Sequence, residues 1–99
     1  MAARARKAVL LLHEKLVRED GAIVELVIWR LPRATPDRPH RLKYRLYLGR
    51  GGECLVRYDN EAGKGDHRHM GTKEMPYVFV SIDQLLDDFL GDVAAWRGN

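Results

Sequence analysis

Chemically reactive side chains gather in one short stretch of the sequence, residues 58–69. His67 and His69 are two residues apart there, so an extended backbone would project both imidazoles to the same side. Such a pair suits a general acid and a general base near neutral pH, and neighbouring cations can stabilise charge that develops on a phosphate. The candidate catalytic residues are therefore His67, His69, Lys64, Arg68 and Asp59.

The same stretch has two other interpretations. Polar segments that contain glycine are often plain surface turns, in which Asp59 and Asn60 would cap the local backbone. A metal site would need a third ligand beside the two histidines, such as Asp66, Asp59 or His40, and this spacing is not a recognised metal motif. We therefore expect no metal and no other cofactor. Nucleotide-binding and serine-hydrolase motifs are also missing from the sequence.

A basic strand is predicted upstream of this stretch. Residues 41–48 alternate strictly between apolar side chains and cationic or aromatic ones, which is typical of a half-buried strand. Its outer face could bind phosphates, and Tyr47 could stack on a base, although a plain solvated surface explains the pattern as well. Trp29, Tyr44 and Trp96 are expected in the core. The candidate nucleic-acid-binding residues are Arg41, Lys43, Arg45, Tyr47 and Arg57.

Two further strands are predicted before the basic strand. Residues 9–18 and 22–31 flank Asp20-Gly21, a dipeptide that suits a tight hairpin because both residues tolerate positive φ. A helix over residues 5–19 is the competing prediction, since apolar residues there also fall on one helical face. Three prolines between residues 31 and 39 then exclude a helix or a central strand, so that segment is a loop.

The glycine-rich segment at residues 49–52 predicts a second hairpin, which leads into a strand at residues 53–58. An odd loop length would pair Leu46 with Cys54 on a common apolar face, and would pair Tyr44 with Val56 and Leu42 with Tyr58. The same register would bring the cations of Lys43 and Arg57 together, which favours an anion between them.

A short strand at residues 77–80 and a helix from Ser81 complete the predicted fold. Ser81 and Gln84 have the spacing of a capping box, an apolar stripe follows, and Gly98 is placed to end the helix. Its acidic residues Asp87, Asp88 and Asp92 are expected in water. The fold class is then α+β, with an antiparallel sheet of about five strands in meander order and the C-terminal helix packed on one face.

Composition limits the chain to one globular domain, residues 1–99. Its 99 residues carry a formal net charge of +3, and 45% of them are apolar. A single cysteine, Cys54, allows no internal disulfide and favours a reducing cytoplasm. The apolar run at residues 8–12 is too short for a signal peptide or a membrane span. A basic chain of this kind is compatible with nucleic acid as a partner.

Several strings of residues also carry a family resemblance. They are Val-Ile-Trp-Arg-Leu-Pro at residues 27–32, His-Arg-Leu-Lys-Tyr-Arg at 40–45, Val-Arg-Tyr-Asp-Asn-Glu at 56–61 and Gly-Lys-Gly-Asp-His-Arg-His at 63–69. With these strings the sequence resembles the TumE-like toxin family of bacterial toxin-antitoxin systems. The resemblance implies a small toxin encoded beside a helix-turn-helix antitoxin that neutralises it by direct contact. It supplies no catalytic residue.

Together these observations give one leading hypothesis and two rivals. The leading hypothesis is a toxin that binds RNA across the basic strand face and cleaves it without metal, with His67 and His69 as acid and base. The first rival is a binding module for nucleic acid or antitoxin that has no catalytic activity, and the second is a metal-dependent hydrolase. Expected partners are the antitoxin and RNA or the ribosome, with no membrane, and open edge strands leave room for a homodimer.

Overall fold

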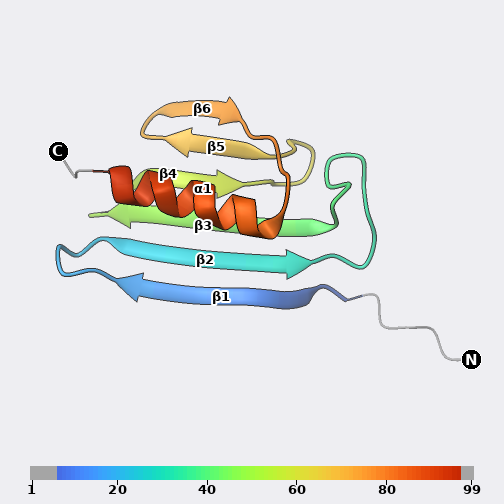
Figure 1. The fold of residues 1–99 in the computed structure, drawn as a ribbon, viewed down its shortest axis with the longest axis horizontal. Helices are drawn as coiled ribbons and strands as arrows, with labels where there is room; N and C mark the ends of the chain where they lie inside the picture. The colour runs from blue at the N-terminus through green and yellow to red at the C-terminus, as the bar shows by residue number, and fades with distance from the viewer. Residues whose placement is uncertain (1–6, 97–99) are drawn as a thin grey trace, which may run out of the picture.

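The computed structural model describes residues 7–96. Their main element is one antiparallel sheet whose six strands follow each other in chain order, with a single helix lying across its middle strands (Figure 1). This arrangement confirms the α+β class and the meander order, with six strands in place of five. The elements are β1 (Val9–Val17), β2 (Ile23–Arg30), β3 (Leu42–Arg50), β4 (Glu53–Asp59), β5 (His67–Met70), β6 (Lys73–Pro76) and α1 (Ile82–Ala95).

The first hairpin confirms the strand prediction for the N-terminal part of the chain. β1 pairs with β2 along its whole length, and a carboxylate oxygen of Asp20 accepts the backbone N–H of Ala22 at 2.9 Å in the turn. Gly21 adopts the positive φ of 85° that the turn requires. The competing helix over residues 5–19 is therefore wrong for the part described, because pairing with β2 satisfies the backbone that a helix would have bonded internally.

The end of the sheet differs from its prediction. The segment at residues 77–80 is no strand, and the additional strands are β5 and β6, which form a hairpin around Gly71 with φ of 62°. Val78 and Val80 are 80% and 70% exposed in the connection from β6 to α1. β-Branched residues favoured a strand there, but after the Tyr77 N–H, which donates to the carbonyl of Asp66 at 3.1 Å, the connection leaves the sheet to reach the helix.

The register between β3 and β4 also differs. Leu46 faces Tyr58 and not Cys54, because β3 continues to Arg50 and the turn consists of the two positive-φ residues Gly51 and Gly52. Val56 and Tyr58 stay on their predicted face, because their shift is an even number of residues. A bulge between Leu48 and Gly49 then pairs Cys54 with Gly49, and Leu55, which is 5% exposed, takes its place in the core. Lys43 faces Trp29 and Arg57 faces Tyr47, so the predicted cation pair does not form.

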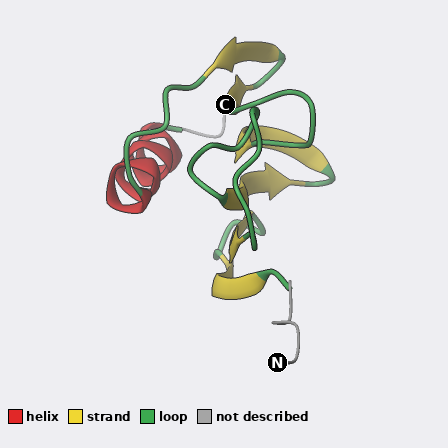
Figure 2. Cartoon of the chain, turned by 90° about the vertical axis from the view of Figure 1, so that its right-hand side faces the viewer, coloured by secondary structure: helices red, strands yellow, loops and turns green. Residues whose placement is uncertain are grey.

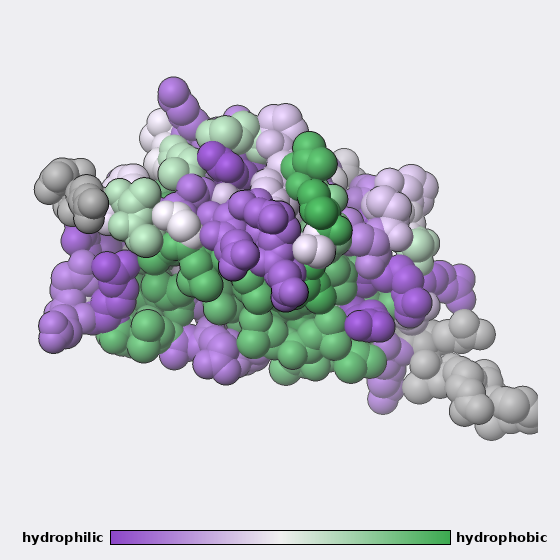
Figure 3. All heavy atoms as spheres, viewed as in Figure 1, coloured by the Kyte–Doolittle hydropathy of each residue, from purple (hydrophilic) through white to green (hydrophobic). Residues whose placement is uncertain are grey.

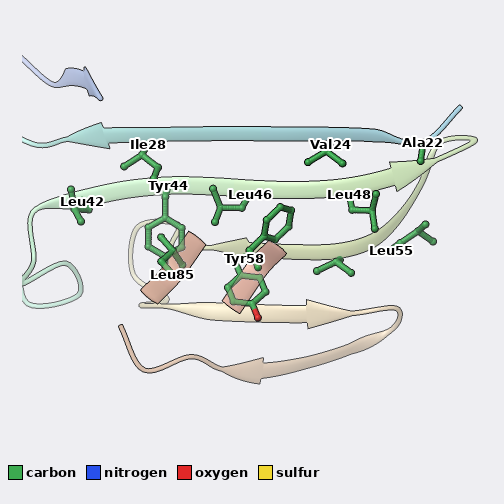
Figure 4. Close-up of a cluster of buried hydrophobic side chains, with 12 residues drawn as sticks. Ala22, Val24, Ile28, Leu42, Tyr44, Leu46, Leu48, Leu55, Tyr58 and Leu85 are labelled. Atoms are coloured by element: carbon green, nitrogen blue, oxygen red, sulfur yellow. The ribbon is translucent and has the colours of Figure 1, made fainter. Parts of the chain in front are cut away.

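The two faces of the sheet have different environments, and α1 lies against only one of them (Figure 2). On this helix face, apolar side chains of β3 and β4 pack under Leu85 and Phe89 of α1, and both of these are fully buried (Figure 4). Each such side chain contributes roughly 1.5–3 kcal/mol on burial. The predicted apolar side of β3 is confirmed: its members Leu42, Tyr44, Leu46 and Leu48 are all buried.

The helix begins at its predicted N-cap, but two of its acidic side chains are less exposed than predicted. Ser81 Oγ accepts the N–H of Gln84 at 3.0 Å, while the Gln84 side chain bonds to Asp88, so the reciprocal half of the capping box is not made. Asp88 and Asp92 are half-buried, and the prediction that both point into water is wrong. The helix ends at Ala95, and Gly98 lies outside the described residues.

α1 covers the middle of the sheet and leaves the β1 side uncovered. Apolar side chains extend below the helix over β2 and β1 (Figure 3), and Leu16 remains 62% exposed there. The opposite side of the sheet, called the open face from here on, carries no helix among residues 7–96.

Candidate active site on the open sheet face

Strand pairing brings the reactive side chains of three strands together on the open face. His67 on β5 lies opposite Asp59 on β4, and His69 lies opposite Arg57. β6 then adds Glu74 opposite His69. The sequence predicted that an extended backbone would put both histidines on one side, and β5 is extended. We call these five residues the histidine cluster.

His69 is the most closely contacted member of the histidine cluster. Its Nε2 lies 3.1 Å from Nη2 of Arg57, 3.5 Å from a carboxylate oxygen of Glu74 and 4.0 Å from one of Asp59. A guanidinium can only donate, so Nε2 of His69 accepts and carries no proton in this arrangement. Arg57 also forms an ion pair with Asp59, with 3.0 Å between Nε and the oxygen but without the angle of a hydrogen bond.

His67 is held by its other ring nitrogen. Nδ1 lies 2.9 Å from the carbonyl oxygen of Gly65, which can only accept, so Nδ1 carries the proton. Nε2 then faces Glu74 at 3.9 Å. A shallow open depression beside the ring is also lined by Lys64, Met75 and Pro76. Lys64 therefore stands at the edge of the histidine cluster.

Arg68, by contrast, projects to the opposite side of the sheet. Its guanidinium stands 5.8 Å from the ring of Tyr58, and its Nε lies 3.6 Å from Asp92 of α1. Alternation along β5 places Arg68 on the helix face for the same reason that it places both histidines on the open face. Of the five candidate catalytic residues, the structure thus brings four to one surface and separates the fifth.

A buried polar network fixes the loop that leads into β5. The Asn60 amide takes the place of a strand partner for β3: Nδ2 donates to the carbonyl of Leu42 at 2.7 Å and Oδ1 accepts the N–H of Tyr44 at 3.1 Å. Asp66 accepts from the Tyr44 hydroxyl at 2.6 Å and lies 3.0 Å from Nε2 of His40. The turn interpretation expected Asn60 to cap the local backbone, but its amide instead satisfies a strand that is distant in the sequence.

The loop that precedes β3 is clasped to the same segment. The Arg38 guanidinium donates twice to the carbonyl of Asn60, at 2.9 and 2.7 Å, and Asp37 accepts the N–H of Gly63. This backbone hydrogen bond is the main reason that the pKa of Asp37 lies below its ordinary value. The proline-rich loop therefore braces the approach to the histidine cluster.

Four of the five predicted nucleic-acid-binding residues lie on the open face, and Arg41 is apart from them. Lys43 and Arg45 are exposed on the open face, and the Arg45 guanidinium lies 4.6 Å from the centre of the Tyr47 ring. Arg57 belongs to the histidine cluster. Arg41 is separate: its backbone has φ of 65°, and its side chain donates to the carbonyls of Leu31 and Pro32 in the preceding loop.

Comparison with known proteins gives a match to a family model. The family model described as Toxin TumE matches residues 7–97. The chain belongs to the TumE toxin family. No curated protein and no solved structure matches the chain. Among its described residues, no helix is long and apolar enough to cross a membrane.

In this TumE-family chain, one residue of the site was not predicted from the sequence and one residue of the open face was predicted on the wrong side of the sheet. Glu74 joins the histidine cluster through the β5–β6 hairpin, and the only local signal for it is Gly71 between two four-residue strands. Trp29 was expected in the core but lies half-buried on the open face opposite Lys43. Within residues 7–96, no three histidine, cysteine or acidic side chains are arranged to hold a metal ion.

Proposed function

We propose that this chain is the toxin of a toxin-antitoxin system, and that it binds RNA on the open face and cleaves it without a metal ion. One observation carries the proposal: Nε2 atoms of His67 and His69 lie 3.9 and 3.5 Å from the same Glu74 carboxylate. Two imidazoles that converge in this way, beside a fixed guanidinium, can serve one phosphate as acid and base.

His69 is the general base in this proposal. Its Nε2 is unprotonated while it accepts from Arg57, so it can take the proton of a ribose 2′-hydroxyl. The 2′-oxygen then forms a bond to the neighbouring phosphorus. Arg57, held by Asp59, can turn its N–H groups to the phosphate oxygens, on which negative charge develops.

His67 is the general acid. Its Nδ1–H is fixed by the Gly65 carbonyl, and Glu74 stabilises the imidazolium form from the other side of the ring. As the bond between phosphorus and the 5′-oxygen breaks, His67 gives its Nε2 proton to that oxygen. The products are a 2′,3′-cyclic phosphate and a 5′-hydroxyl, and proton exchange with water then removes the proton from Nε2 of His69 and returns one to Nε2 of His67.

The test compares RNA cleavage by the wild type with that by His67→Ala and His69→Ala variants, each with and without chelator. His13→Ala is the matched control, because His13 lies on β1 and bonds to Glu25 away from the cluster. We expect chelator-resistant fragments with cyclic-phosphate ends from the wild type and the control. Each cluster variant should lose at least about 100-fold in rate, as is usual for acid-base catalysis.

Three other outcomes would contradict the catalytic proposal. Cleavage at the wild-type rate by both histidine variants would show that neither histidine takes part in the reaction. Cleavage lost on chelation would favour the metal-dependent hydrolase. Salt-sensitive binding of RNA without any product would favour the binding module that lacks catalytic activity.

The proposed protein partner is a helix-turn-helix antitoxin encoded beside this chain. Support for it comes from family membership and from the open face, which a neutralising partner would have to cover or distort. Co-expression should restore growth, and the purified complex should no longer bind RNA. A complex that forms but cleaves RNA at the wild-type rate would contradict neutralisation by direct contact.

A further inference from the structure

The open face carries an apolar hollow that is separate from the histidine cluster. Val27 and Trp29 of β2 lie opposite Arg45 and Lys43 of β3, and these four residues with Tyr44 surround a space of about 160 Å³. Its walls are almost wholly apolar, while two cations stand at its rim. An indole on a sheet face that no helix covers is available to a ligand.

The rim cations are free to bind an anion. Across residues 7–96, neither Lys43 nor Arg45 has a carboxylate within ion-pair distance, and both are exposed. The Arg45 guanidinium rests over the Tyr47 ring, so its direction is restrained. An apolar, aromatic-walled hollow between two positive charges fits a nucleobase whose flanking phosphates reach the rim.

The hollow and the histidine cluster lie on one path across the strands. The ladder from β2 to β5 pairs four residues in succession: Val27, Arg45, Asp59 and His67. The pair of Trp29 with Lys43 lies two residues further along β2 and β3, on the same face. At about 4.8 Å between neighbouring strands, the path from β2 to β5 is roughly 14 Å long. A short single-stranded segment can therefore occupy both places at once.

We propose that the Trp29 hollow is a stacking subsite for one base of single-stranded RNA, with Lys43 and Arg45 holding the phosphates between that base and the cleaved bond. This inference rests on the proposed function. It makes Trp29 a binding residue, since the ring lies three strands from the histidines and touches no reacting atom.

Trp29 fluorescence provides a direct test. The chain has two tryptophans, so a Trp96→Phe protein reports Trp29 alone. The probe is a single-stranded oligoribonucleotide with 2′-O-methyl groups throughout, which lacks the attacking hydroxyl and stays intact. We expect saturable quenching of Trp29 emission on titration, at a concentration that matches binding measured independently by anisotropy.

Substitutions then measure what stacking contributes. Trp29→Ala should weaken binding of the probe roughly 5- to 150-fold, the range for loss of one stacked base. Trp29→Phe should retain most of the affinity and guards against a folding defect in the alanine variant. Lys15→Ala, on the open face of β1 but away from the path, is the matched control and should bind like the wild type.

The outcomes separate this inference from the proposed function. Normal probe binding without quenching, or an unchanged affinity in Trp29→Ala, overturns the subsite while RNA binding stands. Cleavage of unmodified RNA by a protein that does not bind the probe also overturns the subsite alone. If the wild type neither cleaves RNA nor binds the probe, both fail. Quenching by the antitoxin but not by the probe would assign the hollow to a protein partner.

Discussion

Three tyrosines show how single residues couple the sheet to its surroundings. Tyr44 donates its hydroxyl proton to Asp66, Tyr58 donates to Asp92 at 2.5 Å and Tyr77 donates to Asp88 at 2.6 Å. The pKa of all three phenols lies above the ordinary value of about 10. Burial is the main cause, and the hydrogen bonds to carboxylates are the second. Two of the bonds also tie α1 to its position across the sheet.

Alkaline pH should therefore destabilise the fold. Unfolded tyrosines lose their protons near pH 10 while the folded ones keep them, so the folded chain binds more protons above that pH. The free energy of unfolding should be independent of these groups below about pH 9 and should fall as the pH rises beyond about 10. Urea denaturation across this range measures the slope. A Tyr58→Phe/Tyr77→Phe variant should show a shallower slope, and an equal slope would contradict the assignment.

At the scale of elements, Asn60 lies directly after the point at which β4 stops pairing with β3. Its amide satisfies Leu42 and Tyr44 of β3 after the last strand pair of β4, and it is 1% exposed. Such a bidentate side chain lets the backbone turn away toward the histidine cluster without leaving two buried groups unpaired. The loop thus starts from a fixed point.

Substitution of Asn60 should cost much of the fold's stability. Asn60→Ala leaves one buried N–H and one buried carbonyl without partners, at about 1–3 kcal/mol each, so we expect a loss of about 2–6 kcal/mol. Asn60→Asp should fare no better, because a carboxylate cannot donate to the Leu42 carbonyl. Chemical denaturation measures both.

Thr35→Ala, an exposed position in the adjoining loop, is the matched control and should stay within about 0.5 kcal/mol of the wild type. If Asn60→Ala were as stable as that control, the strand-replacing role of the amide would be refuted. A stable Asn60 variant that loses RNA cleavage would instead show that the residue acts through the position of the histidines.

At the scale of the whole molecule, the middle strands of the sheet are covered by the helix and the edge strand β1 is not. α1 covers β3 and β4, while the edge strand β1 keeps Leu10, Leu16 and Val17 about half exposed or more. An unpaired edge with apolar side chains is a surface on which a second strand can add. A second copy of this chain offers an identical strand for antiparallel pairing.

We accordingly expect the isolated chain to self-associate weakly through β1. Sedimentation equilibrium should show a concentration-dependent dimer that Leu16→Lys/Val17→Lys shifts to monomer, because charges on an edge strand oppose pairing. Val78→Lys, at a position more exposed than Leu16 or Val17 but in the connection before α1, is the control and should leave the dimer intact. A monomer at every concentration, or a dimer that survives the β1 variant, would contradict this expectation.

Much of the local structure was predictable from the sequence. Alternation along residues 41–48 identified the buried side of β3, Asp20-Gly21 identified the first hairpin turn, and Ser81 identified the start of α1. Each of these depends on residues that are neighbours in the chain. Side-chain period, turn geometry and capping are local physics, so one segment carries enough information to decide them.

Only the tertiary structure decided what those elements place together. It decided the register of β4 on β3, the presence of Glu74 beside both histidines and the exposure of Trp29 on the open face. Register is decided by the sum of many pairings, and the four-residue strands β5 and β6 are too short to show a period. The histidine pair, Asp59 and Lys64 were candidates from the sequence, but Glu74 was not, because it reaches the histidines only through the pairing of β6 with β5.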